Sequence, residues 1–109
     1  MKDTASVPTL VTYRPKEGTE AQFLALLEKH WPTLDRAGLV TKDQPKIWRA
    51  TGKDGKVSFV EIFAWKDQAS SDVAHQTPEV MAVWEPMGAI LEGMQINRIE
   101  PVEFAGGNA

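Results

Sequence analysis

The sequence contains no cysteine and no long uninterrupted run of apolar residues. Without cysteine the chain has no disulfides, no thiolate metal ligands and no thiol nucleophile. Its apolar runs are broken by charge, glycine or proline before the roughly 18 residues that a membrane-spanning helix requires. The polar start of the chain lacks the apolar stretch of a secretory signal. We therefore expect a cytoplasmic protein with no membrane partner.

Positive charge is also scarce, because 12 Lys and Arg residues against 15 Asp and Glu residues give a net charge of −3. Surfaces that bind nucleic acid are strongly basic, so we expect no nucleic-acid partner. The 109 residues are 42% apolar and 25% charged, which is typical of a single globular domain. A domain of this size buries only about 60–65% of its unfolded surface. A second subunit would therefore add to its stability.

The first third of the chain has the signals of a strand followed by a helix. Residues 7–14 are rich in β-branched residues, and turn formers follow them. Thr19, with Gln22 three positions later, predicts a capping box at the start of a helix. Pro32 predicts a kink in this helix, and Gly38 predicts its end. The predicted buried face of the helix consists of Phe23, Leu26, Leu27, His30, Trp31 and Leu34.

A β-hairpin is predicted next, because residues 46–51 and 56–65 flank a turn that contains Gly52 and Gly55. The second strand is apolar at both parities. Val57, Phe59, Phe63 and Trp65 fall on one side, and on the other are Val60, Ile62 and Ala64. A strand covered on one face alternates with polar residues. We therefore expect both faces of this strand to be covered.

Two helical stretches are predicted after the hairpin. The first runs from a cap at Asp67 to Gln76. The second begins at Thr77, where a Thr-Pro-Glu sequence supplies a cap followed by proline at the first helical position. Pro86 predicts a kink in the second stretch, and Gly93 predicts its end.

Residues 95–104 predict a last strand, in which Pro101 requires an edge position or a bulge. The element order is then βαββαβ, an α+β ferredoxin-like fold with two helices on one face of a four-stranded antiparallel sheet. We expect one domain over residues 7–104, between flexible termini at residues 1–6 and 105–109. Two helices cover only one face of the sheet, so we expect a homodimer in which the sheets of two identical chains pack together.

Several local features together resemble one known family. They are a Gly-Thr helix cap after the first strand, a hairpin, and a strand that ends in Trp65-Lys66-Asp67, followed by Ala74-His75 and a Thr-Pro-Glu helix start. Over residues 7–104 the chain resembles the dimeric α+β barrel superfamily, and within it the antibiotic-biosynthesis-monooxygenase-like group. The resemblance implies a barrel of two sheets, helices outside it, and a small-molecule cavity between sheet and helices in each protomer. Stress-responsive and heme-degrading proteins share this superfamily, so it does not imply one reaction.

Two reactions of the resembled family use residues that this chain largely lacks. Heme-degrading members use Asn, Trp and His, and the matching positions here hold Val11, Ala74 and Trp84. Cofactor-independent quinol monooxygenases use Asn, Trp and Tyr, and the matching positions here hold Glu61, Trp65 and Ser71. The heme-degrading triad is therefore absent, and only Trp65 matches the quinol monooxygenases.

Three side chains are candidates for acid–base catalysis. His30 and His75 are the only histidines, and either is a candidate general base, although core packing for His30 and a helix-end role for His75 are the alternatives. Of the two, His75 is the better candidate, because a histidine at its place recurs in the resembled group. Glu61 is expected among buried side chains, where it needs a partner such as Arg49 or Arg98, or else acts as a pocket acid or base. Two histidines without a third ligand predict no metal site.

Aromatic side chains are candidates for a ligand pocket. Indole rings offer large flat contact areas and an N–H donor, which suit a polycyclic or quinone-like ligand, whereas filling of the core is the alternative. The predicted pocket residues are Trp31, Trp65, Trp84, Tyr13 and Met81.

These residues leave more than one function open. The first hypothesis is a small enzyme resembling cofactor-independent monooxygenases, which acts without a bound cofactor on a hydrophobic, quinol-like aromatic substrate. In it, His75 or His30 accepts a proton from the substrate, so that oxygen attacks an electron-rich anion. The second hypothesis is a non-catalytic dimeric protein that binds a ligand or responds to stress. A purely structural dimer with a filled core is the third.

Overall fold

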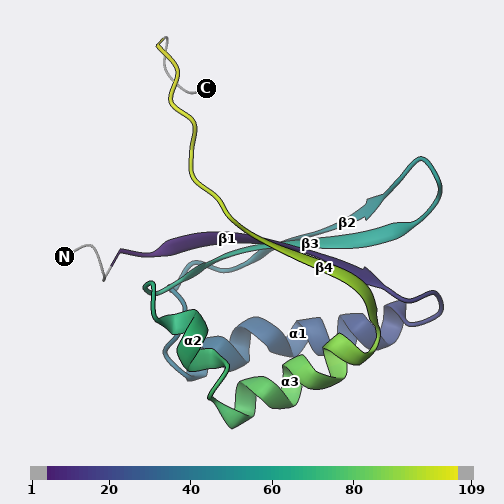
Figure 1. Cartoon of the computed structure of the whole chain (residues 1–109), viewed down its shortest axis with the longest axis horizontal. Coiled ribbons are helices and arrows are strands. Elements are labelled where there is room, and N and C mark those ends of the chain that lie inside the picture. The colour runs from purple at the N-terminus through teal and green to yellow at the C-terminus, as the bar shows by residue number, and fades with distance from the viewer. Residues whose placement is uncertain (1–4, 106–109) are drawn as a thin grey trace.

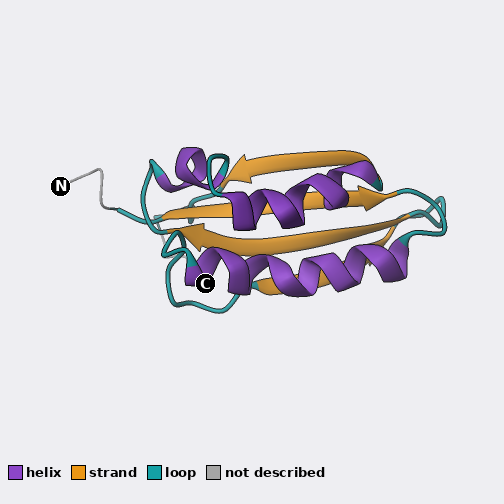
Figure 2. Cartoon of the chain, turned by 90° about the horizontal axis from the view of Figure 1, so that it is seen from below, coloured by secondary structure: helices purple, strands orange, loops and turns teal. Residues whose placement is uncertain are grey.

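The computed structural model describes residues 5–105, which form four strands and three helices. In chain order the elements are β1 (Val7–Pro15), α1 (Glu20–Arg36), β2 (Lys46–Thr51), β3 (Val57–Trp65), α2 (Ser70–Ala74), α3 (Pro78–Ala89) and β4 (Leu91–Arg98). The strands pair antiparallel in the order β2-β3-β1-β4. Figures 1 and 2 show the helices on one side of the sheet, with α1 and α3 side by side. The predicted α+β ferredoxin-like fold is confirmed.

The strand register divides the residues of the sheet between two faces. On the face that packs against the helices, Glu61 lies opposite Val11, and Phe59 lies opposite Tyr13. We call this the helix face, and the other the open face. The open face carries the half-buried apolar side chains of Leu10, Val60, Ile62 and Ala64. Strand β3 is therefore apolar on both faces, as its sequence indicates, and the helices cover one of them.

The core lies between the helix face and α1. Phe23 is fully buried, and its ring lies 5.0 Å from the ring of Tyr13 and 5.3 Å from that of Phe59. The predicted inner face of α1 is confirmed except at Leu26, which is only half-buried. Such contacts between aromatic rings fix the distance between helix and sheet, because the rings interlock at van der Waals separation.

Both ends of α1 follow from local hydrogen bonds, although the predicted capping box does not form. The Thr19 hydroxyl donates to the carbonyl oxygen of Lys16 at 2.6 Å, so it caps no N–H group of the helix. At the other end Gly38 has a positive φ of 75°, which lets the N–H of Leu39 donate back to Leu34 at 3.0 Å. The helix continues through Pro32 and ends at Arg36.

Helix α2 is shorter than predicted. It begins at Ser70, whose hydroxyl donates to the Asp67 carboxylate at 2.8 Å, and it ends at Ala74. Asp67 therefore stabilises the turn before the helix and does not act as its cap. Pro78 occupies the first turn of α3, as predicted, and α3 contains Pro86 without a break.

The prediction for the last strand is wrong at both ends. Strand β4 begins at Leu91 and ends at Arg98, whereas residues 95–104 were expected, and α3 ends at Ala89. Gly93 is therefore a strand residue paired with Arg14, and does not end the helix. The Arg14 guanidinium occupies the space that a Cβ at position 93 would need, so a larger residue there would require this exposed side chain to move. The chain after Arg98 leaves the domain on the open-face side (Figure 1).

The predicted flexible termini fall largely on residues 1–4 and 106–109, which lie outside the described residues. Within residues 5–105, every helix is too short or too polar to cross a membrane.

Replacement of Phe23 by alanine tests the central place of this ring in the core. Phe23→Ala removes a fully buried aromatic side chain, so we expect a loss of about 3–5 kcal/mol in the free energy of unfolding, measured by urea denaturation. The matched control is Leu24→Ala, at an adjacent side chain that is 40% exposed, and we expect it to cost less than about 1 kcal/mol. Equal losses in the two variants would contradict this description of the core.

Candidate functional site

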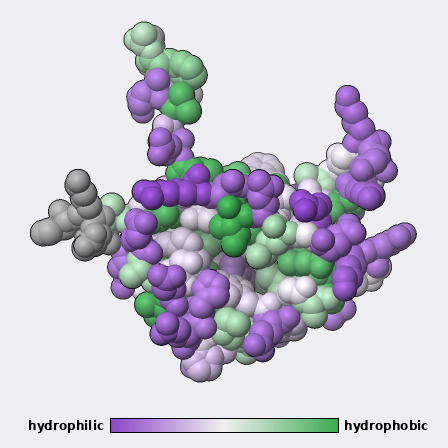
Figure 3. All heavy atoms as spheres, viewed as in Figure 1, coloured by the Kyte–Doolittle hydropathy of each residue, from purple (hydrophilic) through white to green (hydrophobic). Residues whose placement is uncertain are grey.

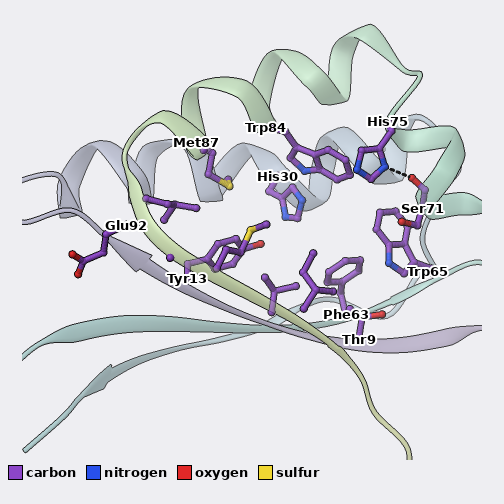
Figure 4. A pocket seen from close by; sticks show the side chains of 16 residues that line it. Thr9, Tyr13, His30, Phe63, Trp65, Ser71, His75, Trp84, Met87 and Glu92 are labelled. Atoms are coloured by element: carbon purple, nitrogen blue, oxygen red, sulfur yellow. Dashed lines mark hydrogen bonds between the residues drawn. The ribbon is translucent and has the colours of Figure 1, made fainter.

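A pocket of about 390 Å³ opens between the helix face of the sheet and helices α2 and α3 (Figure 4). Its volume lies within the range of small-molecule sites, and it accommodates an aromatic molecule of two or three rings. Apolar and aromatic side chains predominate, and none of its residues is Lys or Arg. The lining comprises Thr9, Val11, Tyr13, His30, Phe63, Trp65, Ser71, His75, Trp84, Met87, Gly88, Leu91, Glu92, Gly93, Met94 and Ile96.

A hydrogen-bonded network of three side chains lies at the inner wall of the pocket, which Tyr13 and His30 line. The Tyr13 hydroxyl donates to Oε1 of Glu61 at 2.6 Å. Nδ1 of His30 lies 3.0 Å from the same oxygen and 3.1 Å from Oε2. Glu61 is fully buried and His30 is 3% exposed. The three residues come from β1, β3 and α1, so the network joins helix to sheet.

Glu61 is buried because its position in β3 places it on the helix face between Phe59 and Phe63. A buried carboxylate is costly unless it accepts hydrogen bonds. The predicted partners, Arg49 and Arg98, do not supply them. Arg49 binds Glu20 at 2.8 and 3.1 Å, because edge strand β2 carries it to the surface near the start of α1. Arg98 lies at the exposed end of β4.

Burial and hydrogen-bond partners determine the donors of this network. Burial raises the pKa of Tyr13 far above its ordinary range, and the adjacent Glu61 charge and hydrogen bond raise it further. Tyr13 therefore stays a phenol and donates. The Glu61 carboxylate accepts, so Nδ1 of His30 is the nitrogen that carries the donated proton, and in a neutral imidazole Nε2 is then unprotonated. The lone pair of Nε2 is then left for the pocket, which the His30 imidazole lines.

His75 lines the same pocket from the end of α2. Its Nδ1 lies 2.8 Å from the carbonyl oxygen of Ser71, and a carbonyl can only accept. This contact also selects the tautomer with the proton on Nδ1. The His75 ring packs against Trp84, with ring centres 4.8 Å apart, and Trp84 lies 6.1 Å from His30. Figure 4 shows both imidazoles beside this indole.

The structure brings together most of the residues that the sequence singled out. His30, His75, Tyr13, Trp65 and Trp84 all line the pocket, and Glu61 lies directly behind His30 and Tyr13. Trp65 and Trp84 pack edge to face, with ring centres 6.5 Å apart.

Two predicted pocket residues, Trp31 and Met81, do not line it. Trp31 follows His30 directly, so its side chain leaves α1 about 100° further round the helix and is buried in the core. Met81 lies one turn before Trp84 in α3, whereas the lining residues of this helix run from Trp84 toward its C-terminal end.

The sequence prediction missed the wall that β4 supplies. Leu91, Met94 and Ile96 line the pocket because β4 starts directly after α3. The signal was present, since Met94 and Ile96 alternate with Gln95 and Asn97, which is the period of a half-covered strand.

Among residues 5–105, no group of three or more His, Cys, Asp or Glu side chains is placed to hold a metal ion. Both histidines line the pocket, and because Nδ1 of each contacts a protein oxygen, Nε2 of a neutral ring is the nitrogen that could accept a hydrogen bond from an organic ligand.

Comparison with solved structures finds the same fold in several proteins, among them a cofactor-independent oxygenase and antibiotic biosynthesis monooxygenases. A mutant of SnoaB, a cofactor-independent oxygenase from Streptomyces nogalater, is 16% identical with a TM-score of 0.70, over 92% of this chain and 96% of that chain. Rv0793 from Mycobacterium tuberculosis is 17% identical with a TM-score of 0.64, over 93% of this chain and 99% of that chain. A protein described as an antibiotic biosynthesis monooxygenase is 14% identical with a TM-score of 0.68, over 88% of this chain and 98% of that chain.

No family model and no curated protein matches the sequence. At such low identity the structural likeness shows the fold, which agrees with the resemblance in the sequence. Because one fold supports many reactions, the function has to be argued from the side chains of the pocket.

The raised pKa of Tyr13 predicts how the protein responds to alkali. An unfolded tyrosine ionises near pH 10, whereas the buried phenol does not, so above this pH the folded state holds the extra proton. Stability should therefore fall by about 1.4 kcal/mol per pH unit as the pH rises above 10. Tyr13 is the only tyrosine, so tyrosinate absorbance reports it alone, and we expect this absorbance to appear only as the protein unfolds.

The variant Tyr13→Phe is the control for this response. We expect it to lose about 1.5–3 kcal/mol of stability at neutral pH, because Glu61 loses a donor, and to lack the alkaline contribution of Tyr13. Tyrosinate absorbance near pH 10 in a wild-type protein that is still folded would contradict the assignment.

Proposed function

We propose that the protein is a cofactor-independent monooxygenase of hydrophobic, quinol-like aromatic molecules, with His30 as its general base. The observation that carries this proposal is the buried pair of Glu61 and His30, which lies against an apolar pocket large enough for an aromatic ligand. A histidine held by a carboxylate through Nδ1 has its Nε2 available to accept a proton.

The reaction begins with proton transfer from a phenolic hydroxyl of the substrate to Nε2 of His30. The Glu61 carboxylate, 3.0 Å from Nδ1, stabilises the imidazolium that forms. The phenolate is electron-rich and is surrounded by apolar side chains, where few water molecules solvate its charge. Trp65 and Trp84 line the pocket and hold the flat ring system.

Dioxygen is the oxidant in the second step. For a substrate of the anthrone type, the atoms and electrons of this step balance as follows. The enol tautomer supplies the phenolic proton, and its anion attacks dioxygen through the ring carbon that carries two hydrogens in the keto form. One oxygen atom stays on this carbon as a carbonyl, and the other leaves as water with the two hydrogens. The carbon supplies four electrons and dioxygen accepts four, so no further reductant is required.

A second candidate function is binding of the same class of ligand without turnover. It is favoured by Glu61 and Ser71, which occupy positions where the resembled quinol monooxygenases have Asn and Tyr. In that case the pocket and its two histidines recognise the ligand, and no oxygen is consumed.

Oxygen uptake with dithranol, a dihydroxy anthrone, separates these functions. We expect His30→Gln to lower the rate by about 10²- to 10⁴-fold, because glutamine retains polarity but accepts no proton. The matched control is Lys29→Gln, at the exposed neighbouring position of α1, which should retain the wild-type rate. Wild-type activity in a folded His30→Gln protein would refute the role of His30, and binding without uptake in the wild type would favour the second function.

We also propose that two copies of the chain form a homodimer through the open face of the sheet. Leu10, Val60 and Ile62 lie half-buried on this face, and Trp48, which pairs with Val60, is 61% exposed. The segment after β4 leaves the domain on the same side with Phe104 exposed, and Figure 3 shows apolar atoms on it in green. A self-complementary apolar face is what a two-fold dimer requires.

Light scattering at micromolar concentration tests the dimer, and we expect twice the mass of one chain. Trp48→Lys puts a charge on the open face and should shift the protein toward the monomer. The control Ile47→Lys changes the adjacent residue, which is 42% exposed and belongs to the helix face, so it should leave the mass unchanged. A monomeric wild-type protein would refute the proposal.

A further inference from the structure

The two pocket histidines have the same tautomer for two independent reasons. Glu61 accepts from Nδ1 of His30, and the Ser71 carbonyl accepts from Nδ1 of His75. Each neutral ring therefore has an unprotonated Nε2. The pocket contains two fixed hydrogen-bond acceptors of the same kind, of which the proposed reaction uses only one.

The two acceptors are separated by an aromatic surface. The ring of Trp84 lies 6.1 Å from that of His30 and 4.8 Å from that of His75. The two imidazoles belong to different helices, α1 for His30 and the C-terminal end of α2 for His75. A flat ligand that packs on the Trp84 indole can therefore reach both acceptors with polar groups at separate positions of its ring system (Figure 4).

The other polar groups of the pocket narrow the chemistry of the ligand. The hydroxyls of Thr9 and Tyr13 already donate, to the Val7 carbonyl and to Glu61. No Lys or Arg lines the pocket, so a carboxylate or phosphate would find no cation to pair with. Ser71 also lines the pocket, as does Glu92, whose carboxylate points away from the two imidazoles in Figure 4. Without a cation in the lining, the two imidazole acceptors match a neutral molecule with two O–H donors.

We infer that His75 is a specificity-determining residue, whose Nε2 accepts a hydrogen bond from a second hydroxyl of a planar dihydroxyaromatic substrate. The first hydroxyl of this substrate binds His30. The inference rests on the proposed function for the role of His30, and it adds a second anchor that orients the ring system in the pocket. Since His75 is also partly in contact with solvent, its hydrogen bond has the modest strength of a neutral pair.

Binding without oxygen tests this inference separately from catalysis. Quenching of tryptophan fluorescence under anaerobic conditions gives the dissociation constants of naphthol and of a naphthalenediol with one hydroxyl on each ring. We expect the wild type to bind the diol about 3- to 10-fold more tightly than naphthol. His75→Phe keeps a ring against Trp84 but removes the nitrogens, so it should abolish this preference and bring the dissociation constants of the diol and of naphthol to about the same value.

The matched control is Gln76→Phe, at the next and exposed position, which should keep the wild-type preference for the diol. A wild type without preference, or the same preference in His75→Phe, would overturn the inference. The outcomes also differ from those of the catalytic test. A preference for the diol without oxygen uptake supports the His75 anchor and refutes the enzyme. Oxygen uptake that depends on His30, without a preference for the diol, supports the enzyme and refutes the anchor.

Discussion

A carboxylate in the middle of a sheet imposes the strongest constraint on this fold. Glu61 is fully buried between two phenylalanines, and an unpaired charge there would cost several kcal/mol. Tyr13 from β1 and His30 from α1 both donate to it, so burial of the carboxylate requires helix and sheet to dock in one relative position. Phe23 of α1 joins the same three elements, because its ring packs against Tyr13 of β1 and Phe59 of β3.

The same interaction prepares the site. Because the Glu61 carboxylate accepts a hydrogen bond from Nδ1 of His30, the imidazole ring has a fixed orientation. Nε2 is then the nitrogen that can contact a ligand. The rest of the pocket depends on the turn from α3 into β4, which brings Met94 and Ile96 into the same lining as Trp84. The pocket thus combines a hydrogen-bonded imidazole with an apolar lining, an arrangement that suits proton removal from a hydrophobic molecule.

Much of the fold could be read from local patterns in the sequence. The α1 face, the hairpin around Gly52 and Gly55, and the proline-started α3 depend on spacing and backbone preference, and the structure has them. The errors lie where a long-range contact decides. Gly93 is typical of a helix end, but in the fold it is a strand residue that pairs with Arg14 of β1, which is far away in the sequence.

By itself the sequence determined the element order, the two-sided apolar β3, and the presence of a buried carboxylate and two histidines. Only the tertiary structure decided that Glu61 pairs with Tyr13 and His30, since residues far apart in the chain meet only after the register of the sheet and the docking of α1 are set. It also separated Trp84, which lines the pocket, from Trp31, which fills the core. Composition cannot make that distinction, because indole rings suit both environments and the position of each ring on its helix selects one.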